Sequence, residues 1–487
     1  MTTAKTAPGG LSKFQLTAYA GAYFSTILLS APVANFLPQL YAKELGVSLS
    51  ALGVVIVVTQ VLDAFNQQIC GFLSDRTRTR WGARKPWIAG GATLAIFAAF
   101  FLMRPPPGVG LVWFVCWKIL YDFAWTAKNI GYSAWGAELS GDYRTRSKIM
   151  GAAGFAGQLG NVANETLPIL LFTLGLTAST AYSMKVMGFY WIAGLIMIPL
   201  LHGAALAWAP VGVAPTRERP DLLGLLTSVK ANKPFWRYLA SFTMTGLGIG
   251  ALSLNFTFYD GYLKVGKWFP YLMTIYAVTM VLTIPLWVWI CNRFGKHKAY
   301  TISMLISGCA PLGWALFDPD VVSQTVILSY GVVVVFLIGL GVGCNIVTGS
   351  SMLADIADYG TLKTGVRRTA SYFAFYLLTN KVAIAIGAGI AFATVSAFGY
   401  NPKAGASNTH EAKMALLLVY SVAPVMLKAP AAIYMWWYPL TAKRHGIIQR
   451  RLQSREDRLA RSLAFAADQT GIVVDPTLLA GPPPKVR

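Results

Sequence analysis

Apolar residues in this chain form long blocks separated by shorter polar segments. A block of about 20 apolar residues is the length of helix that crosses a bilayer. The pattern predicts twelve such helices. Six fall in the first half, at 16–41, 49–73, 86–104, 110–138, 150–175 and 186–209, and six in the second, at 238–263, 269–291, 299–317, 323–353, 370–397 and 414–439. The chain is therefore expected to be an all-α membrane protein with two six-helix bundles, residues 1–209 and 238–440.

Two polar segments lie outside these bundles. Residues 210–237 form the longest polar connection and are expected to be a cytoplasmic linker with a short helix near 221–230. In 441–487, apolar residues recur at helical spacing between arginines as far as about residue 469, and a proline-rich end follows. We expect an amphipathic cytoplasmic helix, either lying on the membrane surface or solvated, and then a disordered tail.

Composition supports the membrane assignment and changes the meaning of the charge. Of 487 residues, 55% are hydrophobic and 12% charged, and the mean hydropathy is +0.53. A soluble domain carries about 25% charged residues. The net charge of +22 would suggest nucleic acid. The lysines and arginines, however, gather in both tails and in alternate loops, such as 76–85, which places both termini in the cytoplasm beside anionic lipid. We therefore expect no nucleic-acid partner.

The chain lacks the patterns of an enzyme or a metal protein. Its five cysteines lie in or beside apolar blocks without a C-x-x-C pair, and its four histidines show no ligand spacing. No nucleophile–base constellation or phosphate-binding loop is visible. We expect neither catalysis, nor a bound metal, nor a cofactor.

A weak internal repeat indicates the architecture. The segment 75–87 reads DRTRTRWGARKPW and the segment 292–300 reads NRFGKHKAY, and each joins the second and third helix of its half. Two six-helix halves with matching loops are typical of the major facilitator fold.

Ionisable residues inside the predicted helices are candidates for function, because such groups usually face a cavity. Asp63 lies in the middle of the second helix, and Asn66 and Gln67 follow on the same face. A carboxylate beside two amide oxygens suits a proton or a small hard cation. The alternative is a buried polar cluster that only packs helices.

The fourth helix carries a second polar face. Asp122, Thr126 and Asn129 fall on one side, with Trp125, Tyr132 and Trp135 nearby. Polar groups combined with aromatic rings are typical of carbohydrate sites, whereas isolated tryptophans more often contact lipid. Lys128 could pair with Asp63 or Asp122.

Two further ionisable residues lie at depth. Lys381 is the sole ionisable residue in the middle of the eleventh helix, and a partner such as Asp63 or Asp122 would link the halves and sense cation or substrate. The alternative is a structural ion pair. Glu165, in the fifth helix, could line the cavity or lie near its outer mouth.

Three stretches carry a family resemblance. They are DAFNQQICGFLSDRTRTRWGARKPW (63–87), NIGYSAWGAELSGDYRTRS (129–147) and ADIADYGTLKTGVRRTASYFAFYLLTNK (354–381). They resemble, in the same order, segments of the glycoside–pentoside–hexuronide:cation symporters, the melibiose-carrier branch of the major facilitators. The resemblance implies alternating access and sugar uptake driven by sodium or protons. It also implies a cation site at Asp63, Asn66, Thr126 and Asn129, coupling through Lys381, and cytoplasmic gating clusters at Asp75, Arg78, Arg144, Asp355, Asp358 and Arg368.

Departures from the family pattern leave alternatives open. Gln67 and Asn129 stand where the family has acids, and the first helix has no acid before Glu44. Proton coupling, altered stoichiometry and uncoupled transport are all compatible with a single carboxylate. The expected protein is a monomeric, multi-pass carrier in a bacterial inner membrane that binds a carbohydrate and membrane lipids. An acidic sugar, an organic anion or a lysolipid-like amphiphile is the alternative substrate, the acidic ones favoured by Lys118, Lys128 and Lys381. A non-transporting membrane sensor is the third interpretation.

Overall fold

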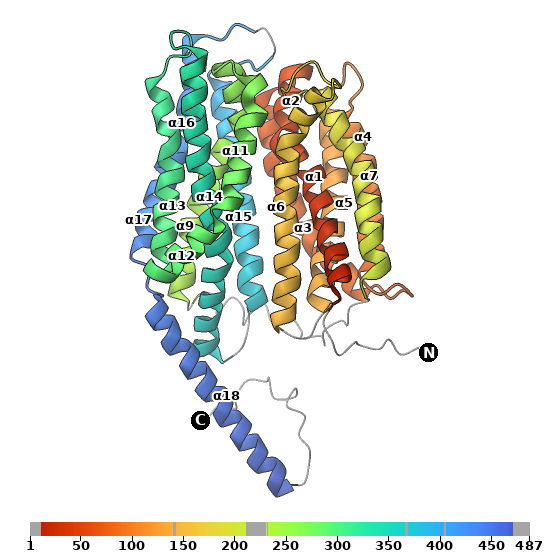
Figure 1. Ribbon diagram of the computed structural model, residues 1–487, viewed down its shortest axis with the longest axis vertical. Helices are drawn as coiled ribbons and strands as arrows, with labels where there is room; N and C mark the ends of the chain where they lie inside the picture. The colour runs from red at the N-terminus through yellow and green to blue at the C-terminus, as the bar shows by residue number, and fades with distance from the viewer. Residues whose placement is uncertain are drawn as a thin grey trace.

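The computed structural model describes residues 11–139, 143–210, 230, 232–365, 369–403 and 406–470. Within these ranges the regular structure is helical throughout. Figure 1 shows two groups of helices side by side, α1–α7 and α9–α17, with α18 extending beyond them. We call the end where α1 begins and α18 leaves the tail end, and the other end the opposite end.

The helices follow the predicted order. The first group contains α1 (Lys13–Asn35), α2 (Leu37–Leu45), α3 (Leu49–Arg76), α4 (Lys85–Met103), α5 (Leu111–Glu138), α6 (Tyr143–Thr173) and α7 (Met184–Trp208). The second contains α9 (Lys233–Ala251), η1 (Leu252–Leu254), α10 (Asn255–Thr257), η2 (Phe258–Tyr262), η3 (Gly266–Trp268), α11 (Phe269–Leu282), α12 (Ile284–Phe294), α13 (Lys296–Cys309), η4 (Ala310–Leu316), α14 (Gln324–Thr364), α15 (Thr369–Ala397), α16 (His410–Ser421) and α17 (Ala423–Trp436). Helix α18 (Ala442–Thr470) follows.

Many of these helices can cross a membrane. In the described part of the chain, nine helical segments are long and apolar enough, and a tenth forms if the bent pair α11 and α12 is one span. Helices α5 and α6, 28 and 31 residues long, are not counted among these segments but pack against them. The protein is therefore a multi-pass membrane protein, while twelve spans and cytoplasmic termini stay predictions.

Several predicted spans are interrupted where proline occurs. The first breaks at Phe36, one residue before α2, whose second residue is Pro38. The eighth bends by 44° at Thr283, just before Pro285. Proline lacks a backbone N–H and collides with the preceding turn, so a new helix begins at it. These breaks place Phe36 and its neighbours where straight helices would not.

Packing across the two groups determines where the site lies. Helix α3 packs against α15, and α6 packs against α11. Within the second group α15 lies very close to α9, where a Cβ on Gly387 would come 2.2 Å from the carbonyl oxygen of Leu247. Helix α15 is thus held between α9 of its own group and α3 of the other.

Residues Ala442–Thr470 form helix α18. Near its start, Ile448 is buried and Leu452 packs against the apolar core at the tail end of the second group. The rest of α18 extends away from the bundle (Figure 1). The linker helix predicted near 221–230 and the final residues 471–487 lie outside the described residues, except for Lys230.

Candidate functional site

One carboxylate joins three helices from both groups. Asp63 of α3 is 4% exposed. It accepts hydrogen bonds from the Thr126 hydroxyl of α5, from the Lys381 ammonium of α15, and from the Gln67 amide at 3.2 Å. Lys381 was expected to pair with Asp63 or Asp122, and in the structure it pairs with Asp63. The contact is an ion pair across the interface between the groups.

The sequence of each helix explains this meeting. Gln67 follows Asp63 by four residues, so the two side chains lie on one face of α3. Helix α3 packs against both α5 and α15, which brings Thr126 and Lys381 to that face. The Lys381 side chain is 37% exposed, whereas that of Asp63 is 5% exposed. The pair therefore joins a buried carboxylate to a lysine whose side chain is partly exposed.

Two amides predicted for the same site lie close by in sequence. Asn66 on α3 is partly exposed. Asn129 on α5 lies three residues after Thr126, and its Oδ1 atom is buried without a hydrogen-bond partner. In the described residues, no group of three or more His, Cys, Asp or Glu side chains could hold a metal ion. A cation at Asp63 would take its other ligands from hydroxyl and amide oxygens.

Lys128 has a different partner from the two expected. Its Nζ atom donates to the Thr26 hydroxyl of α1 at 2.6 Å and lies 3.9 Å from the centre of the Trp125 ring. Asp122 instead pairs with Lys118 at 2.5 Å, one turn earlier on α5. The hydroxyl oxygen and the face of the aromatic ring stabilise the buried ammonium group in place of a carboxylate.

The other two aromatic candidates lie in a separate packed cluster. The Tyr132 ring stacks on Tyr19 of α1 at 4.5 Å, and its hydroxyl donates to the Tyr19 carbonyl. Trp135 is 1% exposed and its indole N–H donates to the Pro210 carbonyl at 2.9 Å. The structure does not bring these two rings to Asp63, and substrate contact by them stays a prediction.

The predicted gating residues are partly described. Asp355 of α14 pairs with Lys296 at 2.7 Å, and Asp358 accepts from His445 at 3.0 Å and from Gln449 at 2.6 Å. These partners come from α13 and α18 of the second group. Arg78 is exposed. Arg368 and the side chains of Asp75 and Arg144 lie outside the described residues.

Sequence reasoning missed these partners. Lys296 stands in the repeated loop, but the repeat places it opposite Ala83, so the repeat gave no signal for its pairing. Arg84 binds Glu138 at 2.8 Å. His445 and Gln449 carried no signal, since the docking of α18 is a tertiary contact.

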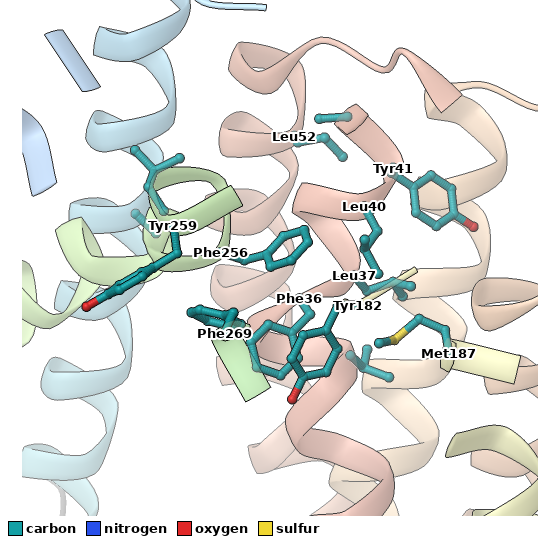
Figure 2. Close-up of a cluster of buried hydrophobic side chains, with 14 of the residues drawn as sticks. Phe36, Leu37, Leu40, Tyr41, Leu52, Tyr182, Met187, Phe256, Tyr259 and Phe269 are labelled. Atoms are coloured by element: carbon teal, nitrogen blue, oxygen red, sulfur yellow. The ribbon is translucent and has the colours of Figure 1, made fainter. Parts of the chain in front are cut away.

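An aromatic cluster joins the two groups at the opposite end, and we call it the aromatic plug. It consists of Phe36 and Tyr182 from the first group and Phe256 and Phe269 from the second. Figure 2 shows the four rings gathered between the groups. The Phe36 and Tyr182 rings stack at 4.1 Å, and Tyr182 meets Phe269 edge to face at 5.8 Å. All four residues belong to one buried apolar core.

Polar contacts reinforce the plug. The Gln39 side-chain oxygen accepts from the Thr257 backbone N–H at 2.8 Å and from its hydroxyl at 2.9 Å. Lys43 and Asp260 form an ion pair of 2.6 Å across the same interface. The opposite end is therefore closed by contacts between the two groups in this structure.

Comparisons with known proteins agree with this arrangement. The model of the family described as "MFS/sugar transport protein" matches residues 18–442. The isoprimeverose transporter of Lactiplantibacillus pentosus is 25% identical, over 92% of each chain. The sodium-dependent lysophosphatidylcholine symporter 1 of Mus musculus is also 25% identical, over 91% of this chain and 88% of that one. Among solved structures, the nucleoside transporter NupG aligns with a TM-score of 0.64 over 87% of this chain and 100% of its own, at 14% identity, which shows the fold alone.

Proposed function

Because the chain belongs to the family of MFS/sugar transport proteins, as its sequence indicated, we propose that it is a secondary active transporter that couples sugar or glycoside uptake to H⁺ or Na⁺. The observation that carries the proposal is the contact of Lys381 and Thr126 with Asp63 across the two groups of helices. A structural ion pair alone would not require a buried carboxylate to face a lysine that stays 37% exposed.

The proposed mechanism is competition for this carboxylate. A proton or Na⁺ bound at Asp63 cancels its charge toward Lys381, so the attraction between α3 and α15 weakens. Substrate contact with the released ammonium would then favour the rearrangement that opens one end and closes the other. The coupling works because binding of the cation to Asp63 weakens the binding of Lys381 to the same carboxylate, and the reverse.

The neighbouring oxygens decide which cation is used. Asp63 by itself takes one proton. Sodium would need further oxygens, and we propose those of Thr126, Asn129, Asn66 and Gln67. The unpartnered Oδ1 of Asn129 supports this set. Since the other candidates are neutral, Na⁺ would be held by one negative charge only.

On the substrate side, Trp125 and Lys381 are the leading candidates. Asp122 is paired with Lys118, and Lys128 is bonded to Thr26. Asp122 and Lys128 would therefore contact substrate only after a rearrangement. The packed rings of Tyr132 and Trp135 would need a rearrangement as well. We propose that residues 1–209 and 238–440 rock about the site as two bundles in a monomer.

The orientation is part of the proposal. Lysines and arginines gather at the tail end, which we place in the cytoplasm of a bacterial cell, with the aromatic plug on the outer side. In the outward-open state Asp75, Arg78, Arg144, Asp355, Asp358 and Arg368 would join the groups at the tail end. Asp355 and Asp358 would then exchange partners within exposed clusters worth about 1 kcal/mol or less per pair.

A second candidate is transport of an acidic or amphiphilic substrate. The lysophosphatidylcholine symporter is as similar to this chain as the isoprimeverose transporter is. Similarity therefore does not choose between sugar and lysolipid.

Uptake into proteoliposomes tests both candidates. Isoprimeverose, a glucuronide and lysophosphatidylcholine would be offered under a pH gradient and under a sodium gradient imposed separately. We expect accumulation of one class and its loss in Asp63→Asn. Asp320→Asn, at an exposed loop carboxylate, is the matched control and should accumulate normally. Accumulation by Asp63→Asn at the wild-type level would refute the site, and no uptake of any solute under either gradient would favour a sensor.

A further inference from the structure

A second buried carboxylate lies behind the aromatic plug. Glu165 of α6 is 8% exposed. One oxygen accepts from the Tyr182 hydroxyl at 2.9 Å and the other from the Asn164 amide at 3.0 Å. Tyr182 is the plug residue that stacks on Phe36 and meets Phe256 and Phe269 of the other group. The carboxyl group is thus hydrogen-bonded directly to a residue of the plug.

Within the described ranges this carboxyl group has no cationic partner. Among the described residues, no Lys, Arg or His forms an ion pair with Glu165. The titratable groups around it are tyrosines: Tyr182 in the segment between α6 and α7, Tyr190 of α7, and Tyr276 of α11. Helices α1 and α5, which also pack on α6, bring it no charged contact in the described part. Asp63, by contrast, has Lys381.

The adjacent amide is short of a donor. Asn164 is fully buried, its Nδ2 atom donates to Glu165, and its Oδ1 atom has no hydrogen-bond partner in the part of the chain that is described. The Asn164 backbone carbonyl is separately engaged by the Tyr190 hydroxyl.

We propose that Glu165 is a second proton-binding site, which holds a proton when the aromatic plug is closed and releases it when the plug opens. This inference rests on the proposed alternating access, but not on the role of Asp63. A carboxylate that leaves water without a cation is costly, whereas the neutral acid is not. Separating Tyr182 from the second group would admit water to Glu165 and remove that cost. The proton moves between water and one Glu165 oxygen, and no other bond changes.

The sign of the pH effect follows. The closed plug binds more protons than the open one, so acid favours closure and alkali favours opening. For a single proton the ratio of open to closed molecules rises by up to about tenfold per pH unit, within the range where the two states differ in protonation.

Distance measurements between spin labels across the plug test the proposal. Labels would be placed at Ser48→Cys, before α3, and Ser323→Cys, before α14, which are exposed positions at the opposite end. The exposed thiols would be removed by Cys116→Ser and Cys309→Ser. The full chain in lipid nanodiscs is measured from acid to alkaline pH. We expect the long-distance population of the otherwise native chain to grow with pH.

Four variants in this background separate the explanations. Combined with Asp63→Asn, which removes the other titrating site, Glu165→Gln should abolish the pH dependence, and Glu165→Asp, which keeps a titratable group, should retain it. Glu411→Gln, at an exposed acid of the same end, should retain it. Asp63→Asn should also retain it while losing cation-driven uptake. The proposal is overturned if the native chain shows no pH dependence, if Glu165→Gln combined with Asp63→Asn keeps it, or if Asp63→Asn alone abolishes it. The last result would leave the proposed function intact.

Discussion

Replacing Lys381 by glutamine tests whether this lysine and the coupling cation compete for one carboxylate. In the structure the Lys381 ammonium is bonded to Asp63, and the carboxylate is 4% exposed. The substitution removes the internal cation, so an added proton or Na⁺ no longer has to displace it. We therefore expect Lys381→Gln to bind the coupling cation more tightly and yet to lose coupled uptake.

The magnitude follows from the geometry. Two unit charges 4 Å apart attract by about 4 kcal/mol at an effective dielectric constant of about 20. The Lys381 side chain is 37% exposed, so solvent screens the pair and about 1–3 kcal/mol is a fair range. Since about 1.4 kcal/mol corresponds to a tenfold change, cation affinity should rise by roughly 5- to 150-fold.

Calorimetric titration with NaCl, and proton uptake measured with a pH indicator, report this affinity in the purified protein. Lys264→Gln is the control, because Lys264 pairs with the exposed Asp320, which keeps Lys413 as a second partner. Its cation affinity should equal that of the native protein. Unchanged or weaker cation binding in Lys381→Gln would show that the lysine supports the cation site and does not compete for it.

Three further predictions concern single residues. Thr126→Val keeps the shape but removes the hydroxyl that donates to Asp63. Loss of a hydrogen bond to the charged carboxylate, about 1.5–3 kcal/mol, should raise proton affinity by roughly 10- to 150-fold, whereas loss of the hydroxyl oxygen as a ligand should weaken Na⁺ binding; the same titrations measure both, and unchanged values would exclude Thr126 from the site. Gly387→Ala should lower the free energy of unfolding by about 1–3 kcal/mol, because its Cβ would meet the α9 backbone at 2.2 Å. Thermal unfolding in detergent measures this loss of stability, and the control Gly71→Ala, which has open space around it, should show none. Lys264 and Lys413 donate to the Asp320 carboxylate and hold its pKa below the usual range. These ion pairs are therefore complete at neutral pH and are lost as the pH falls through that lowered pKa. Backbone hydrogen exchange around Asp320 should quicken only in acid, and quickening at neutral pH would contradict the assignment.

The sequence predicted much of this protein because the deciding signals are local. A block of apolar residues must form a helix in lipid, where backbone groups have no water to bond, and most spans therefore fell where the hydropathy placed them. Asp63, Thr126 and Lys381 were identified for the same reason, since an ionisable or polar residue in an apolar block is conspicuous whatever the fold. The family was recognised from short motifs that keep their order along the chain.

Partners and breaks needed the tertiary structure. Lys128 was expected to meet a carboxylate, but the packing of α5 on α1 gives it Thr26 and the Trp125 ring. The pairing of Asp358 with His445 depends on how α18 docks, and the bond from Tyr182 to Glu165 depends on the path of a connection between two helices. Periodicity fixes which face of a helix a residue occupies, but which side chain it meets depends on the angle and depth at which whole helices pack. Those quantities come from many contacts summed over the molecule, and no segment of the sequence encodes them alone.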